Sequence, residues 1–408
     1  MNTAIRPGSE PAVIDLADAE YWRDPHRALR EAREQYPVAM ASTGEPIVLR
    51  YRDVDALASD SRMNSNALAF VEGQVDSGPL VDWWRLMLTN LNGPNHVRLR
   101  GLVSRAFTPR QVDDKRPRIR ELTRELIDRH ADAREFDVLH DFSHELPIRL
   151  ICEVLGVPAQ HHEDFSRWST DLGAALSSII TPELRMAGEE AATQMSAAVR
   201  DLLKRRRVAP EDDLLSALIR SADEMDERFS DDDLLVLVIN LIFGGHDSSR
   251  SMLAVAVAMF LTHPDQLARL RDDPSLAASA GEEVLRVEPI VPVLSREPSE
   301  DLEVAGVKLP SGKPVLLSIL SANRDPDVFA NPDRFDIARG DARSFSFGWS
   351  AHHCLGAALA RAEIQEVVPE FFSACREVEL LIDAPEWVPF ANLRRIEQLP
   401  IRFEPART

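Results

Sequence analysis

The chain has little cysteine and a deficit of positive charge. Its three cysteines, Cys152, Cys354 and Cys375, are too few and too scattered for a disulfide framework or an iron–sulfur cluster. We therefore expect a reducing, cytoplasmic compartment. Lysine and arginine number 47 against 67 aspartates and glutamates, which gives a net charge of −20. This balance argues against a nucleic acid or an anionic membrane surface as the main partner.

Long apolar runs are also absent. The longest begins at Leu234, covers about twelve residues and stops at His246, which is too short to cross a bilayer. It predicts a buried helix. Residues 1–20 lack the apolar core of a signal peptide or membrane anchor, so we expect no membrane partner.

The apolar pattern predicts a fold class that is mainly α with a minor β region. From about residue 95 to 280 the pattern is almost wholly helical. Short apolar runs separated by proline and glycine predict β-rich portions near residues 40–55 and 289–320. No repeat, low-complexity tract or long linker divides the chain, so a single domain over residues 1–408 is expected.

One segment, Phe345 to Gly356 (FSFGWSAHHCLG), surrounds Cys354 with glycine, histidine and aromatic residues. An ordinary buried thiol is the simplest interpretation. A nucleophile paired with His352 or His353, as in a cysteine hydrolase, is another. Zinc is disfavoured because three near-adjacent ligands cannot easily surround a tetrahedral ion.

The sequence after Cys354, LGAALARAEIQ, is strongly helix-forming, so the cysteine lies in a loop that enters a helix N-terminus. Unpaired N–H groups and the helix dipole stabilise a thiolate there. Gly348 permits a tight loop, Gly356 permits close approach of a flat group, and Phe347 can shield the sulfur. This arrangement suits a thiolate ligand whose electron donation is tuned by its surroundings.

These residues resemble the haem-thiolate signature of the cytochrome P450 family, Phe-x-x-Gly-x-x-x-Cys-x-Gly. Phe347, Cys354 and Gly356 match it, whereas Ser350 replaces the internal glycine. The resemblance implies the cytochrome P450 fold, haem b as cofactor and Cys354 as the axial ligand of its iron. Phe347, Gly348 and Gly356 are then expected beside the cofactor.

The segment EEVLR places Glu283 and Arg286 three residues apart on a predicted helix. As a surface pair they would stabilise the helix by about 0.2–0.5 kcal/mol. The resemblance implies instead a structural Glu-x-x-Arg pair, joined by Arg334 of the segment NPDRF, that holds the cysteine loop in place.

A further segment, LIFGGHDSSRSML from Leu241, puts two glycines and several polar residues inside an apolar helix. Close helix packing at the glycines with a polar outer face is one explanation. The resemblance implies a groove at Gly244 and Gly245 for dioxygen, with Asp247 and Ser248 as the family's catalytic acid–alcohol pair. Reduction of dioxygen consumes protons, which apolar walls cannot supply. Serine stands where the family usually has threonine, and it lacks the methyl group that fixes the rotamer.

Four further side chains match family positions that bind the haem propionates. His96 and Arg100 lie four apart on a predicted helix, Arg296 lies on a predicted strand, and His352 lies two residues before the cysteine. Each is also compatible with an ordinary surface charge. A charge-assisted bond to a buried carboxylate contributes about 1.5–3 kcal/mol.

The resemblance implies a monooxygenase that inserts one atom of O2 into a hydrophobic small molecule. No flavin, nicotinamide or iron–sulfur region is evident, so electrons would come from a ferredoxin and its reductase. A non-catalytic haem-binding sensor and a peroxide-driven variant remain as alternatives. Residues 96–125 are locally basic, and we expect Arg105 and Arg110 to contact an acidic ferredoxin. The chain is expected to be a monomer.

The substrate itself is not predicted beyond its apolar character. Family placement implies a pocket that includes Trp83, Trp84, Ile242, Gly245, Val291, Val293, Leu294 and Phe390. The two tryptophans can equally be pocket lids or anchors of the core.

Overall fold

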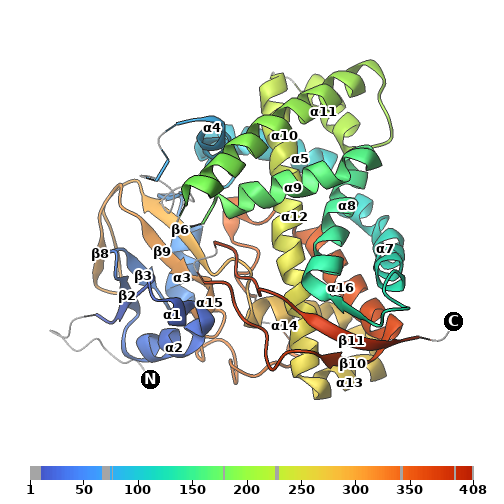
Figure 1. Ribbon diagram of the computed structural model, residues 1–408. Coiled ribbons are helices and arrows are strands. Elements are labelled where there is room, and N and C mark those ends of the chain that lie inside the picture. The colour runs from blue at the N-terminus through green and yellow to red at the C-terminus, as the bar shows by residue number, and fades with distance from the viewer. Residues whose placement is uncertain are drawn as a thin grey trace.

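The computed structural model describes residues 11–66, 74–75, 77–177, 180–225, 229–340, 343–389 and 392–406. Most of the chain is helical; the largest sheet lies at the left of the molecule, and the strands near the C-terminus lie at the lower right (Figure 1). The fold is therefore mainly α with a small β part, as the sequence predicts.

Helices make up the larger part of the molecule. Those of the first half are α1 (Ala19–Arg23), α2 (Pro25–Gln35), α3 (Tyr51–Ser59), α4 (Pro79–Arg85), α5 (Gly93–Ala106), α6 (Pro109–Asp113), α7 (Arg116–Asp128), α8 (Glu145–Leu155), α9 (His162–Ala174) and α10 (Pro182–Val208). Those of the second half are α11 (Leu214–Glu224), α12 (Asp231–Thr262), α13 (Pro264–Asp272), α14 (Ala277–Val287), α15 (Ile319–Ala322) and α16 (Ala357–Ala374). Shorter helical turns occupy Val138–Ser143, Ala159–His161, Pro274–Leu276 and Ser350–His352.

The strands form three sheets. They are β1 (Val13–Ile14), β2 (Val38–Ala41), β3 (Pro46–Val48), β4 (Met63–Ser65), β5 (Glu135–Asp137), β6 (Val293–Pro298), β7 (Leu302–Val304), β8 (Val307–Leu309), β9 (Val315–Ser318), β10 (Cys375–Leu380) and β11 (Pro400–Pro405). The largest sheet has the order β1-β2-β3-β9-β6-β4, and the others are β10-β11-β5 and β7-β8. In the antiparallel β4–β6 pair, Ser65 lies opposite Arg296.

Helix α12 crosses the centre of the helical region (Figure 1). It begins at a capping box, in which the Ser230 hydroxyl accepts from the Asp233 N–H and the Asp233 carboxylate accepts from the Ser230 N–H. Its apolar residues face all sides, and it packs against α8, α9, α10 and α16. A helix that is apolar all round is stable where other helices surround it. Within the described ranges, no helix combines the length and apolarity of a bilayer span.

Helix α16 begins at Ala357, three residues after Cys354, and packs against α12, α14 and α7. A buried hydrogen bond from Ser249 Oγ to Glu363 Oε2, 2.6 Å long, joins α12 to α16. The cysteine loop and the glycine-containing segment of α12 are thus carried by two helices in direct contact.

Candidate active site

The Cys354 loop is closed by backbone hydrogen bonds. The Gly348 N–H donates to Phe345 O at 2.8 Å, and the Cys354 N–H donates to Phe347 O at 2.7 Å. Gly348 has φ +69°, and a Cβ there would lie 3.1 Å from His352 O, so the turn requires glycine. At Gly356 an added Cβ would lie 3.9 Å from the Cys354 sulfur, which is an ordinary contact. Only the first of these two glycines is required by the backbone.

Ser350, the residue that departs from the family signature, also has a positive φ, +53°. The loop thus has the left-handed conformation that glycine favours, although a serine occupies the position. A left-handed residue with a Cβ carries a strain of about 1–2 kcal/mol. The substitution leaves the loop closed, at a cost in conformational energy.

The Cys354 sulfur has mixed surroundings. Burial raises the pKa of its thiol, while N–H groups of Gly356 and Ala357 and the cations Arg100 and Arg361 act in the opposite direction. The residue is nonetheless exposed by surface area. The sulfur therefore borders an open space within the molecule. Protein surrounds this space, but few atoms touch the sulfur itself. Such a thiol ionises readily only when a cation, such as a metal ion, binds it.

Phe347 belongs to this loop, and a guanidinium lies over its ring. The Arg361 Cζ lies 4.3 Å from the ring centroid, and Arg361 also pairs with Glu282 at 2.5 Å. These contacts fix the ring on the side of α16.

Four basic or neutral donors come together near the loop. His96 and His352 stack with ring centroids 4.2 Å apart. Arg100 donates to His353 O at 2.5 Å, and buried Arg296 donates to Ser65 Oγ at 3.2 Å and Ser295 O at 2.9 Å.

No carboxylate of the described part of the chain pairs with Arg100 or Arg296. Burial lowers the pKa of Arg296 to about 10, and burial with nearby cations lowers that of His352 to about 3. A buried guanidinium without a counter-ion is costly. These side chains therefore fit a group that carries two carboxylates, as the propionates of haem do.

The two glycines of α12 differ in their surroundings. An added Cβ at Gly244 would meet nothing within 4 Å, whereas one at Gly245 would lie 3.2 Å from Ile151 Cγ1 of α8. Gly244 thus faces open space, and Gly245 permits close packing of α8. This corrects the prediction for Gly245, since its orientation depends on a helix that the local sequence does not specify.

Asp247 and Ser248 follow on the same helix. The Ser248 hydroxyl donates to Gly244 O at 2.7 Å. The Asp247 carboxylate is buried, with Oδ1 2.6 Å from Arg250 Nη2. That oxygen accepts no aligned hydrogen bond from the described residues, so the contact is an ion pair of poor directionality.

Comparison with known proteins agrees with this geometry. The family model described as Cytochrome P450 matches residues 7–376. The chain belongs to the cytochrome P450 family. It is 36% identical over 405 residues to 6-deoxyerythronolide B hydroxylase of Saccharopolyspora erythraea, covering 96% of this chain and 99% of that protein. It is 37% identical over 396 residues to luteothin monooxygenase of Streptomyces thioluteus, covering 96% and 95%.

Solved structures show the same relationship. The crystal structure of CalO2 has a TM-score of 0.90 at 31% identity and covers 97% of this chain and 99% of that one. Cytochrome P450 enzymes are haem-dependent oxidoreductases that use O2 and a small-molecule substrate, and the similar hydroxylases and monooxygenases place this P450 among the enzymes of the family.

The structural pair of this P450 is buried. Glu283 and Arg286 form two hydrogen bonds of 2.7 and 2.9 Å, and each side chain is 2% exposed. The guanidinium that joins them is that of Arg339, 3.0 Å from Glu283 Oε1. Arg334 is exposed and contributes only its carbonyl, at 3.2 Å from Arg286 Nη2. The prediction for the Arg334 side chain was therefore wrong, because the chain turns between the two arginines and brings the later one inward.

Apart from Gly245, which is described above, the predicted pocket residues fall into three groups. Trp83, Trp84 and Ile242 are buried in the main core, and Trp83 packs edge-on against Phe243 with centroids 5.1 Å apart. The half-buried group consists of Val291, Val293 and Leu294. Phe390 lies outside the described residues.

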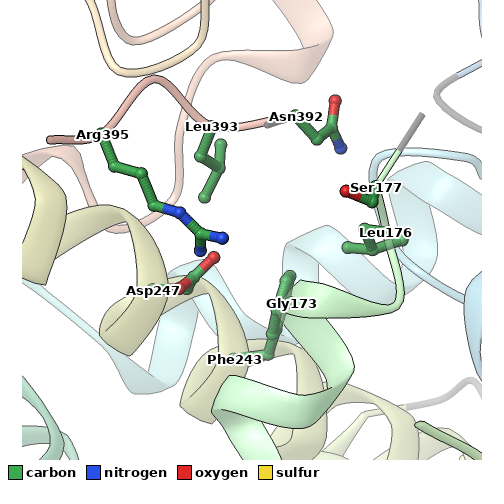
Figure 2. Close-up of a pocket in the computed structure, with 8 residues that line it drawn as sticks. All are labelled: Gly173, Leu176, Ser177, Phe243, Asp247, Asn392, Leu393 and Arg395. Carbon is green, nitrogen blue, oxygen red and sulfur yellow. The ribbon is translucent and has the colours of Figure 1, made fainter. Parts of the chain in front are cut away.

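One small cavity, with a volume of about 20 Å³, lies near Asp247. It lies between the end of α9, α12 and the segment before β11, and its lining is Gly173, Leu176, Ser177, Phe243, Asp247, Asn392, Leu393 and Arg395 (Figure 2). Sequence reasoning missed Arg395. No signal marks it, because an arginine in the polar segment NLRRIEQ is typical of any surface.

Proposed function

We propose that this P450 is a haem-thiolate monooxygenase in which Cys354 binds the iron of haem b and one atom of O2 enters the substrate. The observation that carries the proposal is the exposed Cys354 sulfur, surrounded by N–H donors and cations at the start of α16. Thiolate ligation favours cleavage of the O–O bond. His96, Arg100, Arg296 and His352 would hold the propionates.

The chain's own part in the chemistry lies on α12. The haem, when bound, would supply the activation of dioxygen. Gly244 leaves open space beside α12, and the Ser248 hydroxyl, held 2.7 Å from Gly244 O, can turn to donate toward that space. Asp247, adjacent to Ser248, would pass protons to it. A sensor that only binds a ligand has no need of this acid–alcohol pair.

A cysteine hydrolase is the competing class, and the site disfavours it. The thiol pKa is raised by burial, and the pKa values of His352 and His353 are lowered mainly by burial. A protonated thiol beside neutral imidazoles is a weak nucleophile.

The decisive experiment is the absorption spectrum of the reduced protein with carbon monoxide. We expect a strongly red-shifted Soret band, which reports thiolate ligation. Cys354→His should abolish the shift, whereas Cys375→Ala, which removes another thiol, should retain it. A wild-type protein that binds no haem, or a Cys354→His variant with unchanged spectrum and turnover, would refute the function.

Electrons would come from a ferredoxin that docks on the basic segment of α5 to α7. Much of this segment is neutralised internally, since its arginines pair with acids at Arg98–Asp233, Arg116–Glu366, Arg118–Glu153, Arg120–Glu366 and Arg124–Glu370. Arg105 and Arg110 are exposed and form no ion pair with any described residue. Arg100 and Lys115 also have no ion pair with a described residue, but they are half-buried, so Arg105 and Arg110 are the exposed cations left for an acidic partner.

Charge reversal tests this docking. Arg105→Glu with Arg110→Glu should slow reduction by the ferredoxin and flatten its salt dependence. Arg134→Glu, an exposed charge reversal near β5, is the control. An unchanged reduction rate in the double variant would exclude these two residues from the contact.

Three finer points complete the proposal. The substrate is a hydrophobic small molecule, which the apolar half-buried residues Val291, Val293 and Leu294 support. The protein acts as a monomeric single domain over residues 1–408. Its three cysteines are all free, which is consistent with a reducing cytoplasm.

A further inference from the structure

The cavity beside Asp247 contains a charged side chain that has no hydrogen-bond or ion-pair partner among the described residues. Arg395 is half-buried, and its guanidinium points into the cavity toward Asp247 (Figure 2). The Arg395 guanidinium forms no hydrogen bond and no ion pair within the described ranges of the chain. A guanidinium has five N–H donors in a planar fork that matches a carboxylate. The Arg395 side chain can therefore donate hydrogen bonds to an acceptor group of a ligand.

The charge balance of the cavity points in the same direction. Asp247 is paired with Arg250 at 2.6 Å, so one acid faces two guanidinium groups when Arg395 is counted. Burial lowers the pKa of Arg395, and Arg250 acts in the same direction while Asp247 opposes it. The neighbouring imidazoles of His144 and His246 have lowered pKa values, mainly through burial, so they stay neutral and add no charge. One positive charge remains uncompensated.

The shape of the site favours one end of an amphipathic molecule. Leu176, Phe243 and Leu393 form apolar walls, and the polar lining is that of Arg395, Asn392, Ser177 and Asp247. Gly173 leaves room for the Asp247 carboxylate, since a Cβ at this position would lie 2.8 Å from Asp247 Oδ2. The cavity has a volume of about 20 Å³, room for roughly one water-sized group, so the site suits only the carboxylate end of a molecule.

The cavity borders α12, the helix that carries the residues proposed for the monooxygenase reaction. Phe243 and Asp247 are four residues apart and line the cavity, and Gly244 and Ser248 form the adjacent face of the same helix. A ligand with its polar end at Arg395 would therefore lie close to the helix face that carries Gly244 and Ser248.

We infer that Arg395 is a specificity-determining residue that binds the carboxylate of an acidic, otherwise apolar substrate. This inference rests on the monooxygenase function proposed above and names its substrate class.

Calorimetric titration of the haem-loaded protein tests the inference. The probes are 4-phenylbutanoate and decanoate, each compared with its neutral primary amide. Wild type should bind at least one acid about tenfold or more tightly than its amide, as a charge-assisted bond implies. Arg395→Gln should remove that preference and leave amide binding within about threefold. Arg395→Lys should restore part of it, because the charge returns without the planar fork.

The control is Arg376→Gln, which removes one charge from exposed strand β10 and should leave the acid preference intact. The inference is overturned if wild type shows no acid preference, binds none of the four probes, or keeps its preference in Arg395→Gln. The reduced carbonyl spectrum separates the two levels. A normal red-shifted band without acid preference refutes the Arg395 site alone, whereas an absent band refutes the monooxygenase.

Discussion

Glu363 is a buried acid whose ionisation should set how stability depends on pH. The side chain lies between α16 and α12, is 1% exposed and accepts a hydrogen bond from Ser249. Burial raises its pKa to about 8, against a partial opposing effect of Ser249. The folded protein therefore keeps a proton between about pH 4.5 and 8 that the unfolded chain has already released. Stability contributed by this group is full below that window and falls as the pH rises through it.

The size of the effect on the free energy of unfolding follows from the ordinary carboxyl pKa of 4.5 and the raised pKa of about 8. Each pH unit corresponds to about 1.4 kcal/mol, so the free energy of unfolding should fall by up to about 5 kcal/mol across the window. Glu363→Gln keeps the shape and cannot ionise. Its stability relative to wild type should therefore rise with pH, most steeply between about pH 5 and 8.

Denaturant unfolding of the haem-loaded protein, followed by circular dichroism at several pH values, measures this difference. Subtracting wild type from the variant cancels the titration of other groups. Glu224→Gln, at an exposed residue at the end of α11, is the control and should give a flat difference. A flat difference for Glu363→Gln as well would show that the acid is ionised in the folded protein, and the reasoning would fail.

Three further predictions concern the loop, the structural pair and the proton relay. Ser350→Gly should raise the unfolding free energy by about 1 kcal/mol, because it removes a Cβ at φ +53°; no gain in thermal unfolding would contradict the strain. Arg339→Ala should destabilise by about 1–3 kcal/mol and weaken haem retention, while Arg334→Ala should stay within about 0.5 kcal/mol; the reverse order would contradict the ion-pair geometry. Ser248→Ala should raise peroxide release per NAD(P)H consumed, and unchanged coupling would remove the hydroxyl from proton delivery.

The sequence predicts best those features that depend on neighbouring residues. Glu283 and Arg286 are three apart on one helix, and Cys354 enters α16 through a loop of residues 345–356, so both arrangements follow from local spacing. The helical class follows from the long periodic segments for the same reason.

Features that depend on distant segments were harder to predict. Gly244 and Gly245 are neighbours in sequence, and only the position of Ile151 on α8 decides which one faces open space. Arg339 replaces Arg334 beside Glu283 because of the path of an irregular segment. Arg395 acquires its importance from α9 and α12, which lie far from it in the chain.

The contact between α12 and α16 has one more consequence. Gly244 lies on α12, and α16 starts three residues after Cys354, so these two helices carry the two segments that would border a bound haem. The bond from Ser249 to Glu363 acts as a spacer between them. Above the raised pKa of Glu363, a charge buried at this contact would favour separation of α12 from α16, so the spacing between Gly244 and the Cys354 loop would depend on the alkalinity of the medium.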